Sequence, residues 1–285
     1  MPLFSTEENR NLVYYLIITY AFSWSFWLPS LLSSFGLIDH VPIFTLFRFF
    51  GSFGPFVSAF SLTARYEGMT GVRILWNRAW HYENWKFLLI GIFLLPFLYL
   101  GSLWLAVITE RSAFPSLSIW DNYMYVLVNF IFFFFMTGPF QEEFGWRGYA
   151  LDKIQTKWNA LESSLVLGGI WSLWHLPLFY ITNTPQANQS FFSFTLTVIL
   201  LSIIFTWLYN NSNGSILIAM IFHAINNLSN SLFPLHNTIS GYSYYTILLD
   251  LAVVIILIIY GPKNLVRKSK KMELRRYKKY EQLIH

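Results

Sequence analysis

The sequence predicts an all-α, polytopic integral membrane protein, with about eight transmembrane helices enclosing a polar cavity open to the cytoplasm. Three observations predict this class. Of the 285 residues, 55% are hydrophobic and only 12% are charged, whereas a soluble domain carries about 25% charged residues. Apolar runs of about 20 residues, the length that crosses a bilayer, recur along the chain. The basic residues fall between these runs in a one-sided pattern.

Eight runs are apolar and long enough to span the membrane. They lie near residues 12–36, 41–64, 86–109, 122–142, 161–182, 191–209, 214–233 and 243–261. The first run is not expected to be a cleaved signal peptide, because acidic residues precede it and aromatic residues fill it. With no internal repeat or linker between the runs, residues 1–262 are expected to form one eight-span domain. Residues 263–285 are expected to form a basic cytoplasmic tail.

The positions of the basic residues predict the orientation. All but two of the 19 Lys and Arg residues would lie on one side of an eight-span protein, and the exceptions are Arg48 and Arg111. Cytoplasmic loops carry an excess of basic residues, so both termini are expected there. The protein would reside in the cell membrane of a prokaryote or the endoplasmic reticulum membrane of a eukaryote. Its net charge of +5 predicts contact with anionic lipid, and no nucleic-acid partner is expected.

Ionisable side chains inside a span are costly, so each is a functional candidate. These residues are Arg48, Glu142, Glu143, Arg147, His175, His223 and Asp250. Arg48 and Asp250 stay unassigned, and a structural role is favoured, in which they pair with each other or with backbone carbonyls. The chain has no cysteine, which excludes thiol nucleophiles and thiolate metal sites.

The segment from Gly138 to Gly148 contains two adjacent acids and a cation. Glu143 and Arg147 are four residues apart and share a helix face, so they are expected to pair. Glu142 and Arg147 diverge by about 140° around the helix, which leaves Glu142 without a local cation. Glu142 is therefore the candidate general base. The alternative is an interfacial salt-bridge cluster.

Two further runs each carry a histidine. His175 precedes Pro177, whose missing N–H weakens the helix there. His223 and Asn227 share one face of the seventh run, and Asn226 is a second candidate on that helix. Taken singly, each could be a packing histidine or an amide that joins helices. Together, the acids, imidazoles and amide on three apolar runs favour one shared site.

This set suits hydrolysis by an activated water. Glu142 would remove a proton from water that His175 helps to hold, and His223 and Asn227 would stabilise the oxyanion. Glu143 and Arg147 would support Glu142. No cofactor is expected to be required. Zinc bound by Glu142, His175 and His223 is the second choice, disfavoured because Arg147 would repel a dication.

These residues resemble the three motifs of the CPBP family of intramembrane proteases. Its members are the CAAX prenyl endopeptidases of the Rce1 type and the bacteriocin-processing or Abi proteins. The matching residues are Glu142-Glu143 with Arg147, then an aromatic residue, Trp171, four before His175, then His223 with Asn227. The resemblance covers about residues 135–230. Trp171 stands where the family usually has Phe.

The resemblance implies a glutamate-dependent intramembrane endopeptidase. Residues matching Glu142 and His175 activate water in that family, and those matching His223 and Asn227 form the oxyanion hole. The substrate would be a membrane-associated peptide or a lipidated protein, such as a prenylated C-terminal C-a-a-X sequence. The alternative is a non-catalytic bacteriocin-immunity or scaffold protein that binds a peptide or partner in the same cavity. An ion-coupled transporter is disfavoured because no internal repeat is present.

The predicted depths of the site residues disagree. Glu142 falls near the cytoplasmic end of its run, whereas His175 lies about 21 Å and His223 about 13 Å along theirs. One site forms only if the fourth helix continues through Arg147 inside the protein, or if a water-filled funnel reaches the site from the cytoplasm. The funnel is the favoured expectation.

Overall fold

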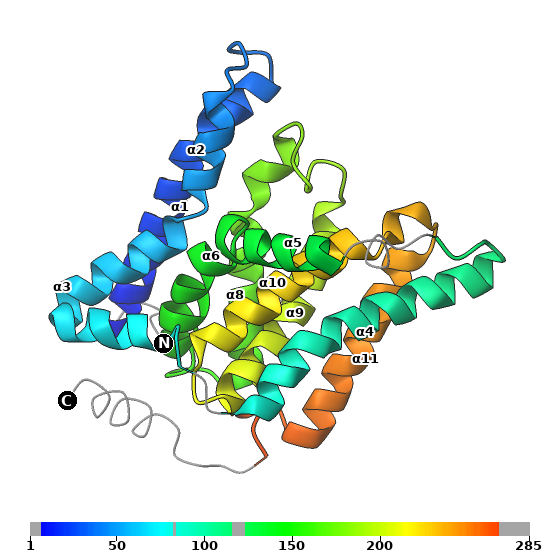
Figure 1. Cartoon of the computed structure of the whole chain (residues 1–285). Helices are drawn as coiled ribbons and strands as arrows, with labels where there is room; N and C mark the ends of the chain where they lie inside the picture. The colour runs from blue at the N-terminus through cyan, green and yellow to red at the C-terminus, as the bar shows by residue number, and fades with distance from the viewer. Residues whose placement is uncertain (1–6, 82–83, 116–122, 268–285) are drawn as a thin grey trace.

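The computed structural model describes residues 7–81, 84–115 and 123–267, and within them the secondary structure is helical, without a β-strand (Figure 1). The predicted all-α class is confirmed. The helices, in chain order, are α1 (Glu7–Ser34), α2 (Ile43–Gly51), α3 (Gly54–Asn77), α4 (Trp85–Glu110), α5 (Tyr123–Met136), α6 (Pro139–Gly145), the π-helix η1 (Trp146–Leu151), α7 (Asp152–Ile154), α8 (Ala160–Trp174), the 3₁₀ helix η2 (Leu176–Tyr180), α9 (Phe191–Asn211), α10 (Ile216–Leu232), the 3₁₀ helix η3 (Leu235–Asn237) and α11 (Gly241–Tyr260).

Several of these helices can cross a membrane. Five of them (α1, α4, α9, α10 and α11) are long and apolar enough, and the number rises to seven if two bent pairs each count as one span. The first pair is α2 with α3, bent by 46°. The second pair is α5 with the segment Pro139–Ile154, which comprises α6, η1 and α7, and it is bent by 43°. α8 has 15 residues, so it extends about 22 Å, less than the roughly 30 Å hydrocarbon layer. A polytopic membrane protein is confirmed, and the count of eight stays a prediction.

The fourth predicted span differs most from the structure. The sequence placed it at 122–142, but α5 ends at Met136, and after the bend the chain continues as α6, η1 and α7 to Ile154. The run does not end at Glu142, because the second limb of the bend begins only three residues before it and continues to Ile154. The depth of Glu142 in the membrane stays a prediction. The helix therefore continues through Arg147 inside the protein, which was the less favoured of the two solutions to the depth problem. The funnel and its cavity stay predictions.

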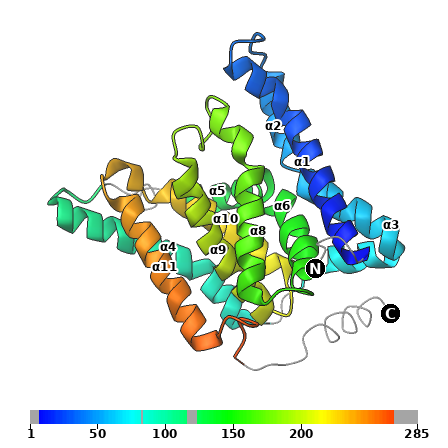
Figure 2. The ribbon, with the colours of Figure 1, turned by 180° about the vertical axis from the view of Figure 1, so that it is seen from behind.

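Helix ends from distant parts of the chain meet at one end of the molecule. The backbone N–H of Ala160 donates to the carbonyl of Lys263, at 2.8 Å, and that of Ile216 donates to the carbonyl of Arg78, at 3.0 Å. We call this the basal end. The hairpin of α1 and α2 rises beyond the other helices at the opposite end (Figures 1 and 2). The predicted cytoplasmic side corresponds to the basal end, and the predicted tail beyond Arg267 lies outside the described residues.

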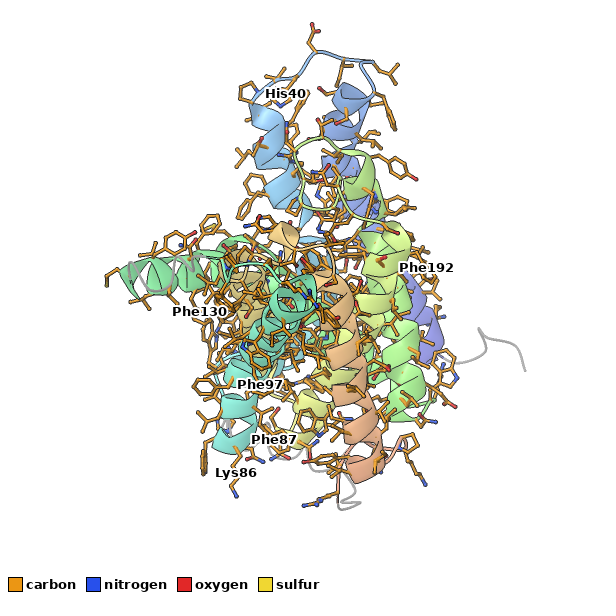
Figure 3. All side chains as sticks on the ribbon, turned by 90° about the vertical axis from the view of Figure 1, so that its right-hand side faces the viewer. His40, Lys86, Phe87, Phe97, Phe130 and Phe192 are labelled. Carbon is orange, nitrogen blue, oxygen red and sulfur yellow. The ribbon has the colours of Figure 1, made fainter. Side chains whose placement is uncertain are left out.

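The outward-facing side chains are largely apolar. Phe97 on α4 and Phe192 on α9 are 73% and 78% exposed and project away from the helices (Figure 3). Lys86 and His40 lie at opposite ends of this apolar zone (Figure 3). Such a surface is stable against lipid and costly against water, which agrees with the membrane assignment.

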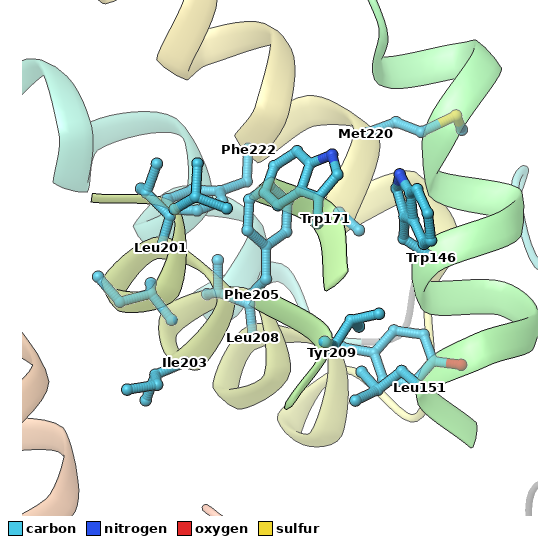
Figure 4. Packing of buried hydrophobic residues seen from close by; sticks show 14 of the residues in the cluster. Trp146, Leu151, Trp171, Leu201, Ile203, Phe205, Leu208, Tyr209, Met220 and Phe222 are labelled. Atoms are coloured by element: carbon cyan, nitrogen blue, oxygen red, sulfur yellow. The ribbon is translucent and has the colours of Figure 1, made fainter. Parts of the chain in front are cut away.

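Large aromatic side chains fill the core between α8, α9, α10 and the limb of α6 and η1 (Figure 4). The ring of Phe205 lies 5.8 Å from that of Trp171 and 4.7 Å from that of Phe222. On the other side, Gly145 lets α6 approach α3 and α1 closely. A methyl group there would lie 2.5 Å from the carbonyl oxygen of Pro55 and from the hydroxyl of Tyr15. The limb that carries both acids is therefore enclosed by protein.

Candidate active site

The two acids lie at the first turn of α6, directly after the bend. Gly138 adopts φ +118°, a conformation that favours glycine, and Pro139 follows as the first helical residue. Gln141 holds this turn with both ends of its amide. Its Oε1 accepts from the Gly138 N–H, at 2.9 Å, and its Nε2 donates to the carbonyl of Phe135, at 2.7 Å. Sequence reasoning missed Gln141, although Gly-Pro followed by Gln at the third helical position is a recognisable helix start.

Glu143 is the centre of a buried charged network. Its carboxylate accepts two hydrogen bonds from Arg147 Nη1, at 3.1 and 3.0 Å, and lies 2.7 Å from His223 Nδ1 through Oε1. Glu143 and Arg147 are both fully buried. The predicted pair of Glu143 and Arg147 is confirmed. The bond to His223 was missed, because it joins helices 80 residues apart.

Glu142 has no arginine or lysine partner among the described residues, as predicted. Two indoles bind its Oε2 instead: Trp171 Nε1 donates at 2.7 Å and Trp146 Nε1 at 3.3 Å. Its other oxygen, Oε1, faces the bend, where a methyl group on Gly138 would lie 2.5 Å away from it. The same point lies 3.3 Å from His223 Cε1. The missing side chain of Gly138 therefore leaves space between Glu142 and His223.

His175 lies at the C-terminal end of α8, which stops at Trp174. The predicted span at 161–182 is therefore too long as a single helix. Pro177 is the reason, because it restricts the residues before it and starts a 3₁₀ turn. His175 Nδ1 donates to the carbonyl of Trp171, at 2.8 Å. Since a carbonyl only accepts, Nε2 of the neutral ring is the acceptor. No direct hydrogen bond joins His175 to Glu142 in the part of the chain described.

Trp171 lies between the two histidines. Its ring centroid is 5.9 Å from that of His175 and 5.4 Å from that of His223. Glu142 and His223 thus face each other across Gly138, and His175 reaches the same region through Trp171. The sequence-based expectation that these three helices meet at one place agrees with this arrangement.

Asn227 lies beside the bend with its amide engaged. Its Nδ2 donates to the carbonyl and to the hydroxyl of Thr137, at 3.1 and 3.2 Å. Asn226, the other candidate, accepts from the hydroxyl of Tyr245. Asn227 therefore contacts the residue that directly precedes Gly138, and in this structure its amide supports the turn.

The two unassigned charges do not pair with each other. Arg48 donates to the carbonyl of Thr182 and to the hydroxyl of Thr45, both at 3.4 Å, whereas Asp250 is exposed on α11. The suggested pairing of Arg48 with Asp250 is wrong, and the alternative of a carbonyl partner holds for Arg48. Neither residue belongs to the site.

The donor set fits a metal poorly. Among the described residues, no three His, Asp or Glu side chains are grouped so as to hold a metal ion. This grouping does not support a zinc site, and independence from a cofactor stays a prediction.

The fold and site define an integral membrane protein with an acid–histidine centre inside the helical bundle. Two comparisons with known proteins agree on its class. Residues 124–229 match the family model for the type II CAAX prenyl endopeptidase Rce1-like family. The chain is also 28% identical over 234 residues, 78% of this chain and 84% of the relative, to CAAX prenyl protease 2 of Methanococcus maripaludis. Both similarities support the predicted resemblance to the Rce1-type CAAX proteases, and with it the prediction of a peptidase.

Proposed function

We propose that the protein is a glutamate-dependent intramembrane endopeptidase that cleaves a peptide bond near the C-terminus of a membrane-associated, CAAX-type substrate. The relative named CAAX prenyl protease 2 supports the substrate class. The observation that carries the mechanism is the position of Glu142. Its Oε2 is held by two indoles and its Oε1 faces His223 across Gly138.

In the first step, Glu142 Oε1 takes a proton from a water molecule as that water attacks the scissile carbonyl carbon. A positioned carboxylate of this kind contributes about 10²- to 10⁴-fold in rate. His175 holds the same water through Nε2, the nitrogen left as an acceptor when Nδ1 donates to Trp171. The proton on Glu142 then passes to the leaving amine as the C–N bond breaks. The products are a new carboxylate and a free amine.

His223 stabilises the oxyanion that forms on the attacked carbonyl. Because Nδ1 faces Glu143, Nε2 can donate only when the ring carries both protons. The Glu143 carboxylate, 2.7 Å away, stabilises that imidazolium. The two negative charges of Glu142 and Glu143 are then balanced by the positive charges of Arg147 and the imidazolium. This balance limits the cost of burying the four groups. Asn227 becomes the second donor when the substrate displaces its amide from Thr137.

The two termini and the basal end are assigned to the cytoplasm, because cytoplasmic loops carry the excess of basic residues. The membrane is the cell membrane if the source is a prokaryote. A substrate with its C-terminus at the cytoplasmic surface then reaches the site from the basal side.

The test is cleavage of a prenylated C-a-a-X peptide reporter by purified protein in lipid. We expect Glu142→Gln, His175→Ala and His223→Ala each to lower kcat/KM by at least about 100-fold. The matched control is Asp250→Asn, the same change of acid to amide at the exposed position on α11, which should keep wild-type turnover. Peptide binding without cleavage by the wild type would overturn the proposal and favour a scaffold. Turnover that survives thorough chelation would support a mechanism without zinc.

A further inference from the structure

Trp171 makes a contact that a phenylalanine at its position could not make. Its indole N–H donates to Glu142 Oε2 at 2.7 Å, a short distance for a nitrogen donor. Trp171 is buried, so this donor lies inside the protein and not at its surface. A phenylalanine here would fill similar space but offers no N–H.

The same residue also contacts the other members of the site. Its carbonyl accepts from His175 Nδ1 at 2.8 Å, and its ring packs at 79° to the ring of His223, with 5.4 Å between the centroids. The guanidinium of Arg147 lies 4.5 Å from the centre of its ring, within the range of a cation–π interaction. One residue thus contacts the base and the supporting cation with its side chain, His223 with its ring and His175 with its backbone carbonyl.

The bond from Trp171 distinguishes the two oxygens of Glu142. Oε2 accepts the indoles of Trp171 and Trp146, which occupy the lone pairs on that side. Oε1 faces Gly138 and His223 and remains the oxygen that can accept a proton. Trp146 alone would hold the carboxylate less firmly, because its distance of 3.3 Å lies beyond the usual range.

We propose that Trp171 is a positioning residue that fixes the carboxylate of Glu142 through its indole N–H, so that Oε1 and not Oε2 acts as the base. This rests on the proposed function. Trp171 does not touch the reacting atoms and acts through Glu142. Hydrogen bonds to charged groups are worth about 1.5–3 kcal/mol, which corresponds to about a 10- to 150-fold effect on rate.

The experiment removes the N–H and keeps the shape. Trp171 is replaced by 3-benzothienylalanine, in which sulfur stands in place of the indole N–H, and separately by Phe (Trp171→Phe). We expect kcat on the prenylated peptide reporter to fall about 10- to 150-fold for both variants, with KM within about twofold of wild type. A purely structural role would leave the benzothienyl variant as active as wild type.

The matched control is Trp207, a buried tryptophan on α9 whose indole N–H has no hydrogen-bond partner among the described residues. The same two replacements there should leave kcat unchanged. If both Trp171 variants keep wild-type kcat, the positioning role is overturned and the proposed function stands. If the wild-type protein itself does not cleave the reporter, the proposed function fails first, so the two failures are distinct.

Discussion

Two buried arginines of this protein, Arg78 and Arg147, are used in opposite ways. Each of the three side-chain nitrogens of Arg78, at the basal end, donates to an oxygen. Nε donates to the carbonyl of Gly214 and Nη1 to that of Gly148. Nη2 donates to Asp152 and to the hydroxyl of Tyr209. These partners come from α7, η1, α9 and the connection between α9 and α10. Arg78 therefore fastens the basal end together.

Arg147, in contrast, forms hydrogen bonds through only one of its nitrogens among the described residues. Its Nη1 meets both oxygens of Glu143, whereas Nε and Nη2 have no hydrogen-bond partner among the described residues. Its guanidinium lies instead over two rings, 3.8 Å from the centre of Phe205 and 4.5 Å from that of Trp171. Unsatisfied buried donors are costly. The difference indicates that Arg147 is kept for its charge beside the acids, and Arg78 for its geometry.

The largest effect is expected from Arg147→Met. It leaves the Glu143 carboxylate fully buried with His223 as its remaining cationic partner, and breaking a buried pair in this way costs about 3–5 kcal/mol. Chemical denaturation in mixed micelles should show the loss. Adding Glu143→Leu should restore most of the stability and none of the cleavage activity. A single variant as stable as wild type would remove the contrast between the two arginines.

A smaller loss is expected from Arg78→Met, about 1–3 kcal/mol. The side chain of Asp152 is 31% exposed, so water can replace some of the hydrogen bonds that Arg78 donates to it. Because Arg78 holds the basal end and not the acids, cleavage per folded molecule should stay within about threefold of wild type. A drop in activity as large as that of the Glu142 variant would show that the basal end and the site are coupled.

The smallest effect is expected from Tyr209→Phe. It removes a hydroxyl that donates to Asp152 Oδ1, at 2.9 Å, and contacts Arg78, while both charges stay paired. A single hydrogen bond of this kind is worth about 1 kcal/mol, which would appear as a small decrease in the apparent Tm in detergent. A loss equal to that of Arg78→Met would mean that the tyrosine, rather than the ion pair, holds this end together.

Local sequence patterns predicted much of this molecule. The runs at 86–109, 191–209 and 243–261 closely match α4, α9 and α11, because an uninterrupted apolar run has few structural alternatives. The pair of Glu143 and Arg147 was also predictable, since it depends only on helical spacing. Hydropathy failed at Glu142. A hydropathy pattern places the end of a span at an acid. In this protein Arg147 balances the charge of Glu143, and two indoles bind Glu142, inside the protein.

That compensation comes from residues far along the chain. His223 reaches Glu143 from α10, and the indole of Trp171 reaches Glu142 from α8. No periodicity in the sequence reports which atoms of two distant helices will meet. The same holds for Asn227, whose contact with Thr137 depends on a bend that the apolar run from 122 to 142 conceals.

The clamp formed by Gln141 has a consequence for how this segment can vary. Gln141, which fixes the bend through Phe135 and Gly138, directly precedes Glu142. The direction in which Glu142 leaves the helix is therefore set by the residue before it. A single insertion or deletion after Gln141 would turn everything beyond it by about 100°, carrying each acid out of reach of its present donors. Length changes should therefore be tolerated in the connections between helices and forbidden in the segment from Gly138 to Gly148.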